Sequence, residues 1–76
     1  MHLASDVNAV VEGLRPYLIH GERYVVVYYS QPDDRETVHQ AQLSADALPA
    51  GLRVGDRIVV HAVMGVVAGV TRLGDD

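Results

Sequence analysis

The stretch Tyr24-Val25-Val26-Val27-Tyr28-Tyr29 decides the fold, because six consecutive β-branched or aromatic residues are the strongest strand signal in the chain. Both faces of this strand are apolar, whereas a strand with one face in water alternates polar and apolar residues. The stretch therefore predicts a strand that is covered on both sides.

Three further stretches downstream predict strands. Glu36 to Leu43 alternates polar and apolar residues, which is typical of a strand with one face in water. Ile58 to Val63 and Val66 to Arg72 are rich in valine and follow the turn signal Gly55-Asp56. Between the first stretch and the other two, Ser44 to Leu48 predicts a single helical turn with Ser44 as its N-cap.

The first segment is ambiguous between helix and strand. Its apolar residues recur at helical spacing, and Pro16 would end such a helix by disfavouring helical geometry at the residue before it. Three of the four residues are valine, which favours a strand instead. The four residues concerned are Val7, Val10, Val11 and Leu14.

The order of elements predicts a mainly β protein with one domain over residues 1–76. Three strands, a helical turn and two strands are the order of the OB-fold, a small five-stranded barrel, and an SH3-like barrel is the neighbouring alternative. Residues 1–15 supply either an N-terminal helix or the first strand. Residues 73–76 are expected to be a frayed acidic tail.

The composition excludes several classes of protein. The chain has 76 residues and no cysteine, so it holds a single core, no disulfide and no thiolate metal site. Its basic residues number 6, all of them arginine, against 10 acidic residues. This balance argues against a general nucleic-acid coat. The longest apolar stretch, Ile58 to Val70, is shorter than the roughly 20 residues of a membrane helix, so a cytoplasmic location is expected.

Three short stretches resemble bacterial translation initiation factor 1. Val10-Val11-Glu12-Gly13-Leu14 resembles the opening strand of that family, and Val54 to Val60 resembles its penultimate strand. Gly69-Val70-Thr71-Arg72 resembles its closing strand. The resemblance implies an OB-fold and binding of ribosomal RNA. The family's basic central loop is replaced here by Ser44 to Leu52, which contains an acidic residue and no basic one.

Catalytic and metal-binding patterns are sparse. The sequence has no nucleophile elbow and no phosphate-binding glycine loop, so we expect no enzymatic activity and no cofactor. His39 and His61 lie on different expected strands and could converge. With Asp56 or Glu36 they would offer ligands for a divalent metal, which is the metal-binding alternative.

Aromatic and basic residues offer a second alternative, binding of single-stranded RNA. OB-folds bind single strands by stacking bases on aromatic rings beside cationic side chains. The acidic balance of the chain weakens this alternative. The residues that would carry it are Arg15, Tyr17, Arg23, Tyr28 and Arg35.

The surplus of apolar surface points to a partner. Tyr24 to Tyr29 and Ile58 to Val70 are apolar on both faces, yet one small barrel covers only the inner face. We therefore expect an interaction module that self-associates or docks on another protein. The outward residues would be one alternating set or the other on each strand. The set that we assign to the surface is Tyr24, Val25, Val27, Tyr29, Val59, Val63 and Val67.

Overall fold

The computed structural model describes residues 4–73. Five strands and one short 3-10 turn make up this range: β1 (Ala4–Ile19), β2 (Glu22–Gln31), β3 (Asp34–Ser44), η1 (Ala45–Ala47), β4 (Arg57–Val63) and β5 (Val66–Arg72). The expected order of strands and helical turn is confirmed. An N-terminal helix is wrong, because the described part of residues 1–15 belongs to β1. Residues 74–76 of the expected tail lie outside the described residues.

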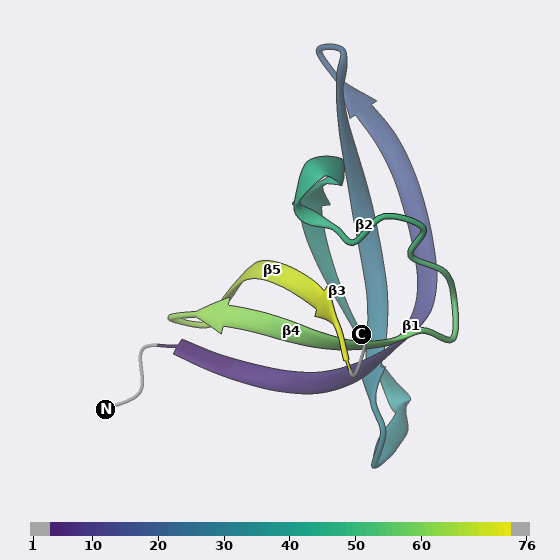
Figure 1. Ribbon diagram of the computed structural model, residues 1–76, viewed down its shortest axis with the longest axis vertical. Coiled ribbons are helices and arrows are strands. Elements are labelled where there is room, and N and C mark those ends of the chain that lie inside the picture. The colour runs from purple at the N-terminus through teal and green to yellow at the C-terminus, as the bar shows by residue number, and fades with distance from the viewer. Residues whose placement is uncertain (1–3, 74–76) are drawn as a thin grey trace.

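The strands form one antiparallel sheet in the order β3-β2-β1-β4-β5. β1 pairs with β4 from Ala4 to Val10 and with β2 from Val10 to Ile19. Figure 1 shows that these two halves of β1 run in different directions, so the sheet curls into two parts. The second half of β1 with β2 and β3 is called the β2–β3 arm. The first half with β4 and β5 is called the β4–β5 arm.

The two ends of the sheet do not join. β3 and β5 are the edge strands, and no strand pairing links them within residues 4–73. The mainly β fold is therefore confirmed, whereas a closed barrel is not.

A β-bulge at Glu12 explains the misleading pattern of the first segment. Val11 pairs with Tyr29 and Gly13 pairs with Tyr28, so Glu12 is an extra residue without a partner on β2. An extra residue reverses the side to which the following side chains point. Val11 and Leu14 therefore both reach the core, although they are three positions apart. That spacing is the one expected of a helix.

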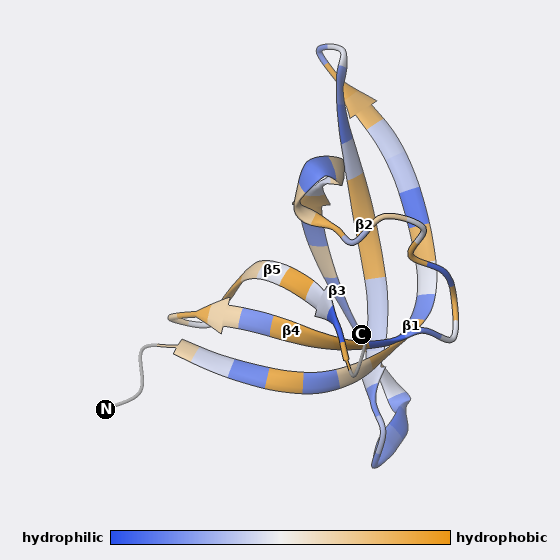
Figure 2. Ribbon diagram, in the orientation of Figure 1, coloured by the Kyte–Doolittle hydropathy of each residue, from blue (hydrophilic) through white to orange (hydrophobic). Residues whose placement is uncertain are grey.

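The core lies on the inner side of the curled sheet, and both arms contribute to it. Figure 2 shows hydrophobic residues concentrated along the middle of β2 and in β4. Fully burying each such aliphatic side chain stabilises the fold by about 1.5–3 kcal/mol. The buried cluster consists of Ala9, Val11, Val27, Leu43, Ile58, Val60 and Val70.

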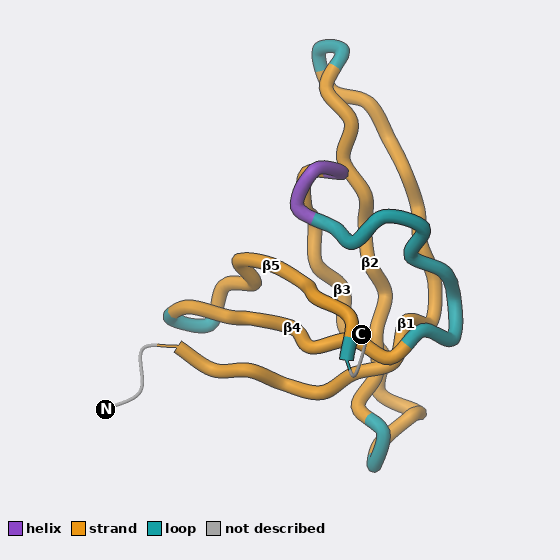
Figure 3. The backbone as a smooth tube through the Cα atoms, viewed as in Figure 1, coloured by secondary structure: helices purple, strands orange, loops and turns teal. Residues whose placement is uncertain are grey.

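The linker between β3 and β4 joins the two arms (Figure 3). Its first turn is capped by the Ser44 hydroxyl, which accepts from the Asp46 backbone N–H at 3.3 Å. Near its middle, the Arg72 guanidinium of β5 donates to the Ala50 carbonyl oxygen at 2.8 Å. The linker is thus fastened to β5 as well as to the strands that it connects.

The end of the linker is held by Asp56. Its carboxylate accepts from the Arg53 backbone N–H at 2.9 Å and lies 3.4 Å from the Arg72 guanidinium. The Arg53 N–H, followed by the positive charge of Arg72, holds the Asp56 pKa below its ordinary value. The backbone also bonds to β1, because the Val11 N–H donates to the Asp56 carbonyl at 2.9 Å. None of the helical segments in residues 4–73 has the length and apolarity needed to cross a membrane.

Candidate interaction surface

Three tyrosines lie together on the outer side of the β2–β3 arm. Val27 is fully buried in the core. Tyr24 and Tyr28 lie an odd number of positions from Val27, so they project from the opposite side of β2. Tyr17 lies directly across from Tyr24, and the two rings stack with their centroids 5.6 Å apart. The result is an aromatic surface on the side of the arm that faces away from the core.

Val26 lies in the middle of this surface, yet it is buried, with only 7% of its surface exposed. The Tyr17 hydroxyl on β1 donates to the Gln42 Oε1 atom on β3 at 3.3 Å, although β2 separates the two strands. This hydrogen bond crosses over β2 on the face that carries Val26, which lies next to Gln42 in the register. Side chains of the same sheet therefore shield Val26 without a covering helix.

Gly13 fits the same surface. Tyr28 lies opposite Gly13 in the register, and a Cβ atom at Gly13 would be 3.4 Å from the Tyr28 ring. The tyrosine ring thus covers a backbone position that has no side chain of its own. We name the set Tyr17, Tyr24, Val26 and Tyr28 the tyrosine face.

The tyrosine face carries little net charge. Arg15 lies opposite Val26 at its centre and forms no ion pair with any described carboxylate. At one end Glu22 accepts a hydrogen bond from the Tyr24 hydroxyl at 2.8 Å, which raises the pKa of Tyr24 above its ordinary value. One positive and one negative side chain therefore flank the three rings.

A second charged cluster lies at the bulge. The Arg35 Nε atom donates to Glu12 Oε2 at 2.6 Å, and the buried Ser30 hydroxyl donates to the same oxygen. Arg35, followed by Ser30, holds the Glu12 pKa below its ordinary value, and Glu12 raises the pKa of Arg35 in turn. The bulge residue is thus tied to both β2 and β3.

The outer side of the β4–β5 arm carries a polar array beside the exposed Val63. The His61 ring on β4 lies 2.7 Å from Asp6 on β1 through Nδ1 and 2.9 Å from the Thr71 hydroxyl on β5 through Nε2. The carboxylate–imidazole–hydroxyl order is one that nucleophilic enzymes use. Here the Asp6 side chain is 68% exposed and that of His61 37%, so water competes for both hydrogen bonds. The array links three neighbouring strands across their outer face.

The assignment of the apolar interaction surface needs correction on β2 and β5. Val27 belongs to the buried core, and Val25, Tyr29 and Val67 pack against that core. The reason is the side to which each alternating set points, which the apolar pattern of β2 leaves undetermined because both of its faces are apolar.

Three residues of that surface remain accessible, and the other alternating set of β2, which the sequence left open, points outward. Tyr24 lies on the tyrosine face, while Val59 is half-buried and Val63 is 47% exposed on β4. Of the alternates on β2, Tyr28 is half-buried on the outer side, and Val26 lies beneath the side chains around it. No signal in the sequence distinguished the two sets.

The structure places the five candidate RNA-binding residues on different faces of the sheet. Arg15, Tyr17 and Tyr28 share one face. Arg23 alternates with the tyrosine face and shares the side of Val25, while Arg35 is paired with Glu12. Among the described residues Arg15 is therefore the one cation without an acidic partner on the same face as the three rings, while Arg23 lines a hollow with Tyr17 and Tyr24 at one end of that face.

The two histidines of the metal alternative lie on opposite sides of the sheet. His39 stacks on Tyr29 with ring centroids 5.4 Å apart, on the side where Tyr29 packs against the core. His61 lies on the outer side, where its two ring nitrogens are hydrogen-bonded to Asp6 and Thr71. Within residues 4–73 no group of three or more histidine, aspartate or glutamate side chains is placed to hold a metal ion. The structure does not assemble the His39–His61 site.

Comparison with known proteins adds no relative, because no family model, no curated protein and no solved structure matches this chain.

Proposed function

We propose that the protein is a small non-enzymatic interaction module that docks on a protein surface through its tyrosine face. The observation that carries the proposal is the grouping of three half-buried tyrosines around Val26 on the outer face of the β2–β3 arm. A second copy of the chain is the simplest partner, because a symmetric dimer places this same face on both sides of the contact.

The chemistry of the face suits a protein partner. Tyrosine and arginine are enriched in protein interfaces, where a ring supplies a large apolar area and its hydroxyl retains a hydrogen bond. Arg15 is available at the centre of the face, and Gln40 and Gln42 border it on β3. The rings are supported from below by the sheet, so little side-chain freedom is lost on binding.

We also infer that the sheet is a relative of the open OB-type barrels. The three-stranded arm, the helical turn before β4 and the long curved β1 support this relationship. The resemblance to bacterial translation initiation factor 1 would place the chain among such folds. Recognition of RNA does not follow from the fold.

Self-association is tested by light scattering on a sizing column at micromolar concentration. We expect a dimer, and we expect Tyr24→Lys to weaken it at least about tenfold because a charged side chain would replace one ring of the stacked Tyr17–Tyr24 pair within the contact. Val63→Lys on the β4–β5 arm is the matched control and should leave the dimer intact. A monomer throughout the micromolar range contradicts self-association, and dissociation by Val63→Lys alone would move the contact to the other arm.

Binding of single-stranded RNA is the second candidate, favoured by Arg15 beside three rings. Stacking on tyrosine is worth about 1–3 kcal/mol per base, but one unpaired cation releases few counterions from the phosphates. Fluorescence anisotropy with a short labelled RNA at moderate salt is the measurement. Binding at tens of micromolar that is lost in Tyr28→Ala would support this candidate over the first, and absence of binding dismisses it.

A further inference from the structure

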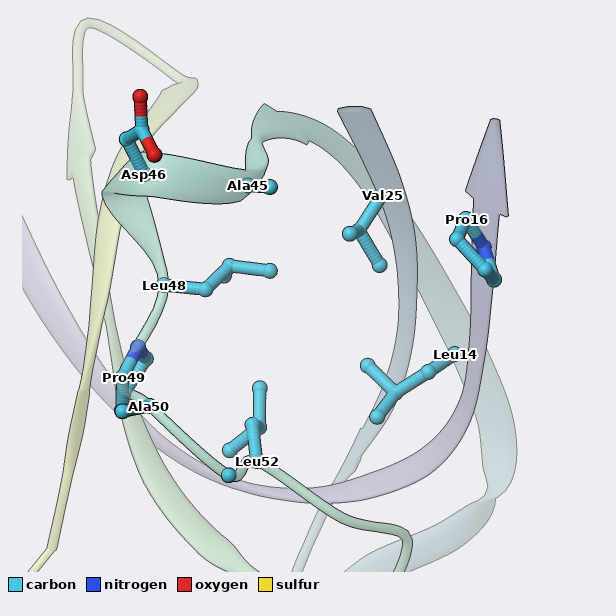
Figure 4. Close-up of a pocket in the computed structure, with 10 residues that line it drawn as sticks. Leu14, Pro16, Val25, Ala45, Asp46, Leu48, Pro49, Ala50 and Leu52 are labelled. Atoms are coloured by element: carbon cyan, nitrogen blue, oxygen red, sulfur yellow. The ribbon is translucent and has the colours of Figure 1, made fainter. Parts of the chain in front are cut away.

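An apolar cavity of about 540 Å³ opens between the β2–β3 arm and the linker. Figure 4 shows Leu14 of β1, Val25 of β2 and Leu48 and Leu52 of the linker pointing toward one another across it. All four side chains are half-buried and pack against the core from one side. Cavities of about 300–1,000 Å³ that are lined mainly by apolar groups are the usual size and character of small-molecule sites.

The wall that the linker provides is fixed in place. Pro49 restricts the backbone between Leu48 and Leu52, and the Ala50 carbonyl accepts from Arg72 at 2.8 Å. Further along, the Asp56 carboxylate holds the Arg53 N–H. These contacts keep Leu48 and Leu52 apart from Leu14, so the cavity exists before any ligand enters.

The cavity continues past the end of β3 toward a free cation. Pro16, Val25 and Ala45 also line an adjoining hollow of about 620 Å³, whose other walls include Arg23 and the Tyr24 ring. No described carboxylate lies within ion-pair distance of Arg23. Its neighbour Glu22 instead faces the other side and bonds to the Tyr24 hydroxyl. The remaining acid on the rim is Asp46, whose carboxylate points away from the cavity in Figure 4.

We propose that this cavity binds a single-chain amphiphile with an anionic head group, such as a free fatty acid. The aliphatic chain occupies the space between Leu14, Leu48 and Leu52, and the head group lies at Arg23. Charge complementarity selects the head group, because the described residues offer a free cation at one end of the hollow and direct the nearby Asp46 carboxylate elsewhere. The proposal does not rest on the docking function, because its apolar space lies on the inner side of the arm, and only the Arg23 end of the hollow borders Tyr17 and Tyr24 of the tyrosine face.

Decanoate below its micelle concentration is the probe, followed by ¹H–¹³C spectra of leucine and valine methyl groups. We expect the methyl signals of Leu14, Val25, Leu48 and Leu52 to shift, and those of the buried Val60 to stay in place. Leu52→Arg should weaken binding at least about tenfold by placing a charge in the apolar space. Its control is Val54→Arg, a change at an exposed linker residue outside the cavity.

The head group is tested separately with variants that do not touch the core. Arg23→Gln should weaken decanoate about two- to fivefold, as expected for an exposed ion pair, and should leave decanol binding unchanged. Arg57→Gln, which removes the same charge from an exposed position on β4, should change neither ligand.

Three outcomes overturn the proposal. The first is the absence of methyl shifts up to about millimolar decanoate, a concentration that corresponds to very weak affinity. The second is preference for decyltrimethylammonium over decanoate, because the cation would then be drawn to Asp46. The third is binding to anionic phospholipid vesicles without binding of monomeric decanoate, because the ligand would then be a membrane surface.

Discussion

The two arms of the sheet share β1 and one core, but their outer faces differ in chemistry. The β2–β3 arm presents tyrosine rings that stack and cover Val26, whereas the β4–β5 arm presents the hydrogen-bonded array around His61. Because water hydrates the second array, its exposure needs no further explanation. The half-buried rings of the first arm group a large apolar area on one face, so this arm is the one on which we place a partner.

The largest expected effect tests whether the arms form one folding unit. Ile58 of the β4–β5 arm and Val27 of the β2–β3 arm are both fully buried in the same cluster. We expect Ile58→Ala to lower the free energy of unfolding by about 2–5 kcal/mol and Val27→Ala by about 2 kcal/mol. The outer neighbour Val59, changed to Ala, should cost less than about 1 kcal/mol.

Urea unfolding followed by two probes makes this test. All four tyrosines lie in β1 and β2 of the β2–β3 arm, and the chain has no tryptophan, so intrinsic fluorescence reports on that arm. Amide signals of β5 report on the other. If Ile58→Ala shifts the β5 transition and leaves the tyrosine transition in place, the two arms unfold independently and the shared core is refuted.

A smaller expected effect is the loss of stability at acidic pH, which depends on one hydrogen-bonded carboxylate in each arm. Glu12 is paired in the β2–β3 arm, while Asp56 holds Arg72 of β5. The pKa of each is lowered on folding, so its contribution to stability is complete above the unfolded-state pKa and is lost as the pH falls through the lower folded value. We therefore expect the urea midpoint to fall on acidification below about pH 4.

Substitution of each carboxylate shows which one causes the loss of stability at acidic pH. Glu12→Gln and Asp56→Asn should each flatten the curve of urea midpoint against pH between about pH 5 and pH 2. The control is Glu36→Gln, since Glu36 is exposed and forms no hydrogen bond or ion pair with a described side chain. A curve as steep in Glu12→Gln as in the parent would show that the Arg35 pair does not contribute.

The smallest effect compares the hairpin turn of each arm. His20 and Met64 have φ values of 51° and 52°, and each is followed by a glycine with φ of 81°. Positive φ at both central residues defines a type I′ turn, which prefers asparagine first. Histidine tolerates this conformation better than methionine, whose side chain is 76% exposed and packs little.

Met64→Asn should therefore raise the free energy of unfolding by about 0.5–1 kcal/mol. His20→Asn, the matched change in the other arm, should raise it less. Thermal and urea unfolding measure both variants. Equal gains at the two turns would mean that backbone strain does not distinguish the arms.

Much of the fold could be predicted from the sequence, because strand and turn signals are local. The run at Tyr24–Tyr29 is β2, and Ser44 caps a single helical turn at the predicted place. The first segment could not be predicted, since the bulge at Glu12 turned a strand into a pattern with helical spacing. A bulge depends on how β1 meets β2, and that pairing is not encoded by either strand alone.

The sequence predicted that an apolar and aromatic surface exists, but it did not predict which residues form it. The surplus of apolar residues on two strands and the presence of aromatic residues were evident from their composition. The division of β2 into an inner set with Val27 and an outer set with Val26 and Tyr28 was not evident. Neither was the cavity, because Leu14 and Leu52 are separated by half of the chain and face each other only when the linker crosses the arm.

The sequence by itself determined the strands, the helical turn, the absence of cysteine chemistry and the excess of apolar surface, because these follow from residue type and short-range pattern. Only the tertiary structure decided which face of β2 is buried, that the sheet stays open between β3 and β5, and where the free arginines lie. The physical reason is the twofold repeat of a strand. A strand that is apolar on both sides has two equivalent faces until packing against its neighbours buries one of them.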